Sequence, residues 1–311
     1  MPGLIDCHAH LTGSGGPDYL ARLQDPDAIL LARAVQNARI LVRTGVLAAR
    51  DVGAARSMNL RARDQLRGRP DAPLILAAGT WIGRRGRYVP FAVQVDTAEE
   101  LRQAVLAQLD AGADLVKVAL DGGTGSAATF SAAELRPAVE VVHARSKKIA
   151  AHAQGLGSRA GADAGFDSID HGYVIDAETA ARMRPRTALV TTLSVPVAFN
   201  NPRELELGLA SVRAARAAGV RIATGTDFGG GPAPAGNFAQ EVELLVRAGL
   251  APHEALASAT WIAGEVLGVP QAGTLAVGAP ADCVLVGGDP LADAGALRRI
   301  TAVFRDGERV V

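Results

Sequence analysis

The sequence predicts an α/β protein built as a (β/α)8 TIM barrel, with a small C-terminal β-strand segment. Short apolar runs alternate with longer helical segments, eight such runs are present, and the pattern changes after the eighth run. Several runs are apolar at consecutive positions, as expected for parallel strands that are covered on both faces. Eight strand–helix units with right-handed crossovers in about 230 residues fit a barrel. An open doubly wound sheet is the alternative, but no Gly-x-Gly-x-x-Gly turn follows the first run.

Each predicted strand is an apolar run of four to seven residues. The eight strands are Leu4–His10, Val46–Val52, Leu74–Ala78, Leu115–Ala119, Ile149–Ala153, Ser168–His171, Ala188–Leu193 and Arg221–Thr226. Two of the intervening segments open with a capping box, in which Thr97 or Ser131 is followed three residues later by glutamate. After the last strand, a helix is predicted over Pro252–Leu267, because proline is tolerated at the first helical position.

Short β-like runs replace the strand–helix pattern from Gly273 onward. They are Thr274–Val277, Asp282–Val286, Thr301–Phe304 and Arg309–Val311, with Asp306-Gly307 as a hairpin turn. We therefore assign residues 1–272 to the barrel and residues 273–311 to the strands of a partial β-sandwich. Because isolated hairpins are only marginally stable in water, this segment is expected to pack on the barrel.

Composition excludes several classes of protein. The chain has 32 Lys+Arg and 32 Asp+Glu, so it lacks the basic excess that is typical of nucleic-acid binders. No apolar run approaches the roughly 20 residues of a membrane helix, and no signal peptide is recognisable at the start. The two cysteines cannot form a disulfide framework, which favours a reduced, cytoplasmic protein. We expect a small-molecule substrate, with no nucleic-acid or membrane partner.

Histidine and aspartate side chains fall at the ends of several predicted strands. His8 and His10 end the first strand, and side chains two apart in a strand point to the same face. Imidazole is the commonest metal ligand, although this pair alone is equally compatible with buried core histidines. His152, His171 and Asp227 end the fifth, sixth and eighth strands. Each of them could be a core or capping residue, but together they lie on the barrel face that carries active sites.

Lys117 lies in the middle of the fourth predicted strand, between apolar neighbours. Lysine is almost never fully buried unless it is paired. One interpretation is an ion pair with an inward-facing carboxylate such as Asp227. The other is an amine whose pKa is lowered by burial, so that its neutral form can react.

These residues occur in an order that resembles the metal-dependent amidohydrolase superfamily. Pro2–His10 is similar to the opening of that family, and Lys117, His152, His171 and Asp227 follow in its order. The family's closing segment is resembled by Gly273–Leu275, Gly278–Asp282 and Gly288–Leu291. Within the superfamily the sequence resembles the prolidase-like and imidazolonepropionase-related group most. That likeness rests on Gly112–Lys117, Asp167–Gly172 and Gly225–Asp227.

The resemblance implies a site with two divalent metal ions, zinc being the expected metal. His8, His10 and Asp227 would hold one ion, and His152 and His171 would hold the other. Lys117, carboxylated by carbon dioxide, would bridge the two ions together with a hydroxide. Asp227 would act as the general acid and base. The implied reaction is hydrolysis of an amide or peptide-like C–N bond, with Xaa-Pro dipeptides or N-acyl amino acids as the first expected substrates.

The sequence departs from the family pattern in two places. The family usually has several β-strands before the barrel, whereas this sequence begins at the barrel. Without those strands a sheet edge would be exposed, which is compatible with a homo-oligomer. Gly83–Tyr88 replaces a Gly-Gly-His-Gly loop; here Arg85, Arg87 and Tyr88 could bind a substrate carboxylate, or the loop could simply be solvated. Gln154 is either a further substrate contact or a polar residue at a strand end.

Two alternative functions are compatible with the same residues. The first is a mononuclear deaminase or cyclic amidohydrolase, similar to imidazolonepropionase, that uses His8, His10, His171 and Asp227 while Lys117 is structural. The second is a catalytically inactive barrel with a binding or structural role, which the missing strands favour.

Overall fold

The computed structural model describes residues 1–311, and it contains a strand at each of the eight predicted places. These strands are β1 (Leu4–Ala9), β2 (Val46–Asp51), β3 (Leu74–Ala77), β6 (Leu115–Ala119), β7 (Lys148–Ala153), β8 (Ser168–His171), β9 (Ala188–Thr191) and β10 (Ile222–Thr224). The structure adds two three-residue strands that the sequence did not predict, β4 (Ile82–Arg84) and β5 (Val93–Val95). Both lie in the loop between β3 and the helix before β6, where the apolar pattern is weak.

The strands pair in parallel as a TIM-barrel-like α/β fold. One sheet has the order β1-β2-β3, and the other has the order β10-β9-β8-β7-β6-β4-β5. The two sheets approach each other where β1 meets the end of β10. There the backbone amides of Thr226 and Asp227 donate to the carbonyl oxygen of His8 at 3.2 and 2.7 Å, and Ala9 bridges Phe228 in parallel. These contacts bring the carboxyl ends of the first and last strands together.

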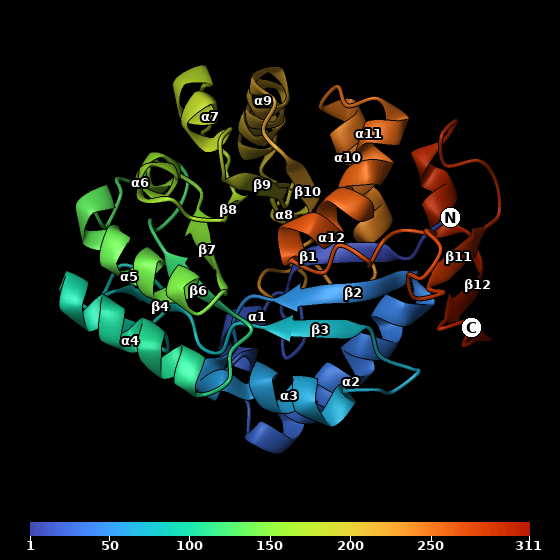
Figure 1. Ribbon diagram of the computed structural model, residues 1–311, viewed down its shortest axis with the longest axis horizontal. Helices are drawn as coiled ribbons and strands as arrows, with labels where there is room; N and C mark the ends of the chain where they lie inside the picture. Colours follow the sequence, from blue (N-terminus) through green and yellow to red (C-terminus); the bar gives the residue numbers. More distant parts are fainter.

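Helices surround the strands on the outside (Figure 1). The longer ones are α2 (Asp27–Arg43), α3 (Met58–Leu66), α4 (Ala98–Asp110), α5 (Ala132–Ala144), α6 (Gly157–Ala164), α7 (Ala177–Met183), α9 (Pro202–Ala218) and α10 (Phe238–Arg247). Two short helices, α1 (Tyr19–Arg22) and α8 (Ser194–Ala198), lie in loops that follow strands. The predicted capping box at Ser131 is complete, whereas Thr97 caps α4 and the Glu100 carboxylate accepts from Asp96 instead. No helix is both long and apolar enough to cross a bilayer.

The predicted helix over Pro252–Leu267 is two helices, α11 (Pro252–Ser258) and α12 (Trp261–Leu267). The chain bends at Thr260, whose φ and ψ of −133° and −107° are not helical. The bend lets α12 pack against β1 and β10. The prediction of one continuous helix was therefore wrong, because packing against the strands overrides the local helical pattern.

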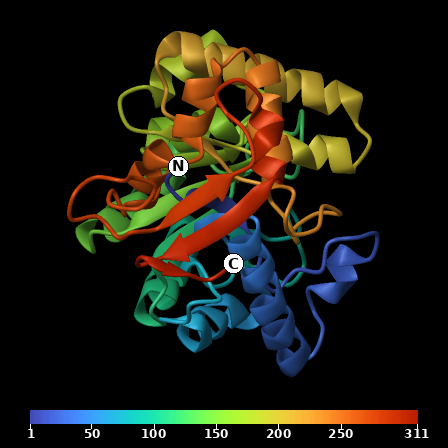
Figure 2. The same cartoon turned by 90° about the vertical axis from the view of Figure 1, so that its right-hand side faces the viewer.

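The C-terminal segment forms an antiparallel sheet of β11 (Cys283–Val286), β12 (Ile300–Arg305) and β13 (Glu308–Arg309). The predicted turn at Asp306-Gly307 is confirmed, and both residues have positive φ. Thr274–Val277, by contrast, is an exposed loop and not the predicted strand. The sheet packs beside α2, close to the chain's N-terminus (Figure 2). In that contact Val284 and Val303 bury their side chains against Val42 and Leu47.

Candidate metal centre

His8, His10 and Asp227 meet at the carboxyl ends of β1 and β10. One oxygen of Asp227, Oδ1, lies 3.3 Å from His8 Nε2 and 3.1 Å from His10 Nε2. All three side chains are buried, and their potential ligand atoms lie within 4.8 Å of one another. Asp227 adopts a left-handed backbone with φ of 52°, which the hydrogen bond from its backbone N–H to the His8 carbonyl oxygen helps to hold. A β-carbon on Gly230 would come within 2.3 Å of Asp227 and His10, so only glycine fits beside this group.

His152 and His171 extend this group from β7 and β8. Their ring centroids are 4.5 Å apart, and the His171 ring lies 4.7 Å from the His8 ring. On the far side of its ring, His171 Nδ1 lies 2.8 Å from the Thr192 hydroxyl, which orients the imidazole. His171 Nε2 is buried and has no hydrogen-bond partner in the protein. A buried polar atom without a partner is costly, and a metal ion would satisfy it.

The protonation of these side chains also suits metal binding. Burial lowers the pKa of His152 to about 3, and burial together with the charge of neighbouring groups lowers the pKa of His171 well below its usual value. Both imidazoles are therefore neutral, which is the form that binds metal ions. Burial alone would raise the pKa of Asp227, but the adjacent His8 and His10 hold it well below its usual value. The donor set thus fits divalent metal ions.

Lys117 reaches the same region from β6, and its ammonium contacts the Asp170 carboxylate. The lysine does pair with an inward carboxylate, but the partner is Asp170 on β8 and not Asp227. Its side chain is almost completely buried. Burial lowers the pKa of Lys117 to about 8, although the charge of Asp170 acts in the opposite direction. The ammonium form still predominates at neutral pH, but the neutral amine is more accessible than for an exposed lysine.

Sequence reasoning missed Asp170 and Arg50, two buried residues. Asp170 contacts His8 and Lys117 of the metal centre, and Arg50 pairs with Asp170. Oδ2 of Asp170 lies 3.1 Å from His8 Nδ1, and its Oδ1 accepts from Arg50 Nη2 at 2.8 Å. Arg50 also donates through Nε to the carbonyl oxygen of Cys7, which directly precedes His8. Burial raises the pKa of Asp170, but Arg50 and Lys117 more than offset this and hold it well below its usual value. Like Lys117, Arg50 is a cation in the middle of an apolar strand, so the same signal could have identified it.

Replacing Arg50 with methionine should destabilise the protein by about 3–5 kcal/mol, because it leaves the buried Asp170 carboxylate without its arginine partner. Thermal or urea unfolding measures this loss. Arg85→Ala is the matched control, since it breaks an exposed ion pair with Asp96 and should cost no more than about 1 kcal/mol. Equal effects of the two substitutions would show that the buried pair carries no special stability.

A cavity of about 470 Å³ opens over the metal centre. It is lined by all six predicted metal-binding residues and by the predicted substrate contacts Tyr88 and Gln154. Arg85 and Arg87 do not line it. Arg85 Nε instead lies 2.7 Å from the Asp96 carboxylate, on the exposed surface of the loop. The structure therefore brings Tyr88 and Gln154 to the site but leaves the two arginines outside the cavity.

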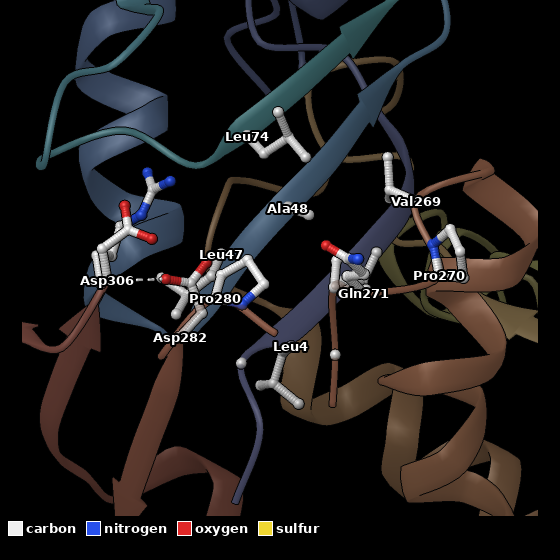
Figure 3. A pocket seen from close by; sticks show the side chains of 15 residues that line it. Leu4, Leu47, Ala48, Leu74, Val269, Pro270, Gln271, Pro280, Asp282 and Asp306 are labelled. Carbon is white, nitrogen blue, oxygen red and sulfur yellow. Dashed lines mark hydrogen bonds between the residues drawn. The ribbon is translucent and has the colours of Figure 1, made fainter. Parts of the chain in front are cut away.

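A second cavity, of about 460 Å³, lies at the opposite ends of β1, β2 and β3 (Figure 3). Its wall is mainly apolar, with Leu4, Leu47 and Leu74 at the strand starts. Asp282 and Asp306 stand at one side, where the Asp306 amide donates to the Asp282 carboxylate at 2.9 Å. No histidine or cysteine lines this cavity. The candidate metal-binding residues instead line the cavity at the carboxyl ends of the strands.

Comparison with known proteins agrees with this geometry. A sequence model of the amidohydrolase family matches residues 1–310. The chain belongs to this family. It is therefore a metal-dependent hydrolase that acts on carbon–nitrogen bonds of small-molecule substrates, as the sequence predicted.

Similar proteins place this amidohydrolase in the prolidase-like group. An uncharacterized protein of Mycobacterium tuberculosis is 32% identical, over 99% of this chain and 84% of its own length. The ochratoxinase of Aspergillus niger is 30% identical, over 99% of this chain and 75% of its own. The solved structure of a Xaa-Pro dipeptidase with bound methionine superimposes with a TM-score of 0.87 at 26% identity, covering 99% of this chain and 86% of that one. The predicted resemblance is confirmed at this level.

Proposed function

We propose that this amidohydrolase hydrolyses a small-molecule amide at a binuclear metal centre, in a closed (β/α)8 barrel. The observation that carries the proposal is that four histidines, Asp227 and Lys117 line one cavity at the carboxyl ends of the strands, with the ligand atoms of His8, His10 and Asp227 within 4.8 Å of one another. His8, His10 and Asp227 would hold one ion, and His152 and His171 would hold the other. The partnerless His171 Nε2 supports the second position. Zinc suits nitrogen and carboxylate ligands of this kind.

The proposed bridge between the ions is a carbamate on Lys117. The neutral amine attacks carbon dioxide, an N–C bond forms, and one proton leaves to solvent. The carbamate carries a negative charge shared by two oxygens. Carboxylation therefore replaces the buried Lys117 ammonium by an anion that could act as a bidentate ligand. Asp170 then loses its contact with an ammonium but keeps Arg50 at 2.8 Å, so its charge remains balanced. The burial that lowers the pKa of Lys117 supports this step, because it favours the reactive neutral amine.

Two divalent ions, when bound, polarise the substrate carbonyl and supply a nucleophilic hydroxide at neutral pH. The protein's own contribution to proton transfer falls to Asp227, whose carboxylate faces the cavity. Asp227 would accept the proton of the attacking hydroxide and return it to the leaving nitrogen, which departs as a neutral amine. Its lowered pKa keeps the carboxylate ionised and favours release of the proton to the leaving nitrogen. Tyr88 and Gln154 line the cavity and are proposed to contact the substrate.

Metal analysis of the purified protein tests this proposal. Protein produced with zinc and bicarbonate should contain about two metal ions per chain, and a chelator should abolish amide hydrolysis. Adding zinc and bicarbonate back should restore the activity. Xaa-Pro dipeptides, N-acyl amino acids and simple arylamides are the first substrates to assay. One metal ion with full activity would favour the mononuclear alternative, and absence of both metal and activity would favour the non-catalytic one.

A further inference from the structure

The cavity over the metal centre has an unusually aromatic wall. The whole chain has twelve Phe, Tyr and Trp residues, and five of them line this one cavity. Tyr19 and Phe199 form an edge-to-face pair with centroids 6.1 Å apart, and Trp81 and Phe91 form another at 5.5 Å. The rings of Tyr88 and His152 pack with their centroids 4.8 Å apart. Aromatic side chains from several loops are therefore concentrated where a substrate must bind.

The charge in the cavity wall away from the metal-binding residues is negative. Glu204, in the first turn of α9, lines the cavity. Its Oε1 accepts from the Thr124 hydroxyl, and its Oε2 accepts from the Asn201 amide at 3.4 Å. These partners are neutral, and Glu204 takes part in no ion pair. Glu206, two residues along the same helix, is by contrast bound to Arg247 at 2.6 Å.

Away from the proposed metal ions, the cavity wall offers no cationic side chain to a substrate carboxylate. Lys117 is the only lysine or arginine in its wall; its ammonium is paired with Asp170, and the proposed carbamate would carry no positive charge. In the neighbouring loop Arg84 pairs with Glu134 and Arg85 with Asp96, and Arg87 is exposed and does not line the cavity. A free carboxylate on the substrate would therefore meet Glu204 without a compensating charge, which disfavours it. A positive charge would meet both a carboxylate and the electron-rich faces of aromatic rings, and this combination attracts cations.

We propose that the site selects amides that carry a cationic group, an ammonium or quaternary ammonium, remote from the scissile bond, and that Glu204 is the specificity-determining residue. This inference rests on the proposed amide hydrolysis and adds the substrate class. It departs from the Xaa-Pro and N-acyl amino acid substrates expected from sequence, both of which carry a free carboxylate. Glu204 does not touch the reacting atoms in this scheme; it discriminates between substrates through their remote charge.

A matched series of acetanilides tests the selection by rate. The para substituent is trimethylammonium, its neutral isostere tert-butyl, or carboxylate. We expect kcat/KM of the zinc-loaded enzyme to be about tenfold higher for the cation than for the isostere, and lowest for the carboxylate. Glu204→Gln should abolish the preference for the cation, and Glu204→Lys should reverse the order in favour of the carboxylate. Glu206→Gln removes a carboxylate from the same helix outside the cavity and should leave the order unchanged.

A binding experiment separates this inference from the proposed reaction. Choline and its neutral isostere 3,3-dimethylbutan-1-ol are titrated into the zinc-loaded protein by calorimetry, with no turnover required. Choline should bind about tenfold more tightly, and Glu204→Gln should remove that difference while Glu206→Gln keeps it. Choline selection without hydrolysis of any amide would leave the inference standing and overturn the proposed function. Equal binding of the two ligands, or a cation preference that survives Glu204→Gln, would overturn the inference.

Discussion

Replacing Lys117 with alanine is expected to abolish amide hydrolysis and to lower the metal content from about two ions per chain to one or less. The substitution removes the nitrogen that would carry the bridging carbamate, and groups that act as a unit lose nearly all of their effect when one is deleted. We expect kcat/KM to fall by about a thousandfold or more. Elemental analysis and initial-rate assays on the same preparation measure both quantities.

Two further variants keep the Lys117 test informative if alanine also disturbs folding. Lys117→Met retains the buried aliphatic stem without the amine, so it should fold and still lack the bridge. Lys147→Ala removes a lysine that lines no part of the metal centre and should leave rate and metal content unchanged. A short carboxylic acid such as propionate should partly restore metal content and rate in Lys117→Ala, because it can supply the missing oxygens. Full activity of the alanine variant would rule out the bridge.

Replacing Asp227 with asparagine is expected to lower kcat by about a thousandfold even when the metal sites are saturated. The amide has nearly the same shape as the carboxylate, but it can neither accept the proton of the attacking hydroxide nor return it to the leaving nitrogen. General acid–base groups contribute about 10²- to 10⁴-fold to rate. Steady-state kinetics at increasing zinc concentration measure the loss and separate it from weaker metal binding.

The matched control for this second substitution is Asp163→Asn. Asp163 lies on the surface in an ion pair with Arg182 at 2.8 Å, far from the chemistry, so this variant should keep its rate. A fall of less than tenfold in kcat for Asp227→Asn, with two metal ions still bound, would assign the proton transfer to another group. A fall that disappears entirely at high zinc concentration would leave Asp227 with a ligand role only.

The strands were predictable because their signal is local. Each buried parallel strand is a short apolar run bounded by polar residues, and the structure has a strand at each of the eight places predicted for the barrel. The prediction failed where packing decides the outcome. Thr260 interrupts the expected helix so that α12 can pack on β1 and β10, and Thr274–Val277 remains an exposed loop because no strand lies beside it. The helix break and the loop both depend on contacts with residues that are distant in the sequence.

By itself, the sequence determined the family, the barrel-like order of strands and helices, and the residues that gather at the carboxyl ends of the strands. The order of strands and helices follows from periodicity, the strand-end residues follow from local residue type, and the family follows from the resemblance of the ordered motifs. Only the tertiary structure decided that Lys117 pairs with Asp170 and not Asp227, that Arg50 supports that carboxylate, and that Glu204 lines the cavity while Arg85 lies outside it. Charge pairing in a buried site depends on which side chains different strands and loops bring within a few ångströms, and sequence spacing does not encode that distance.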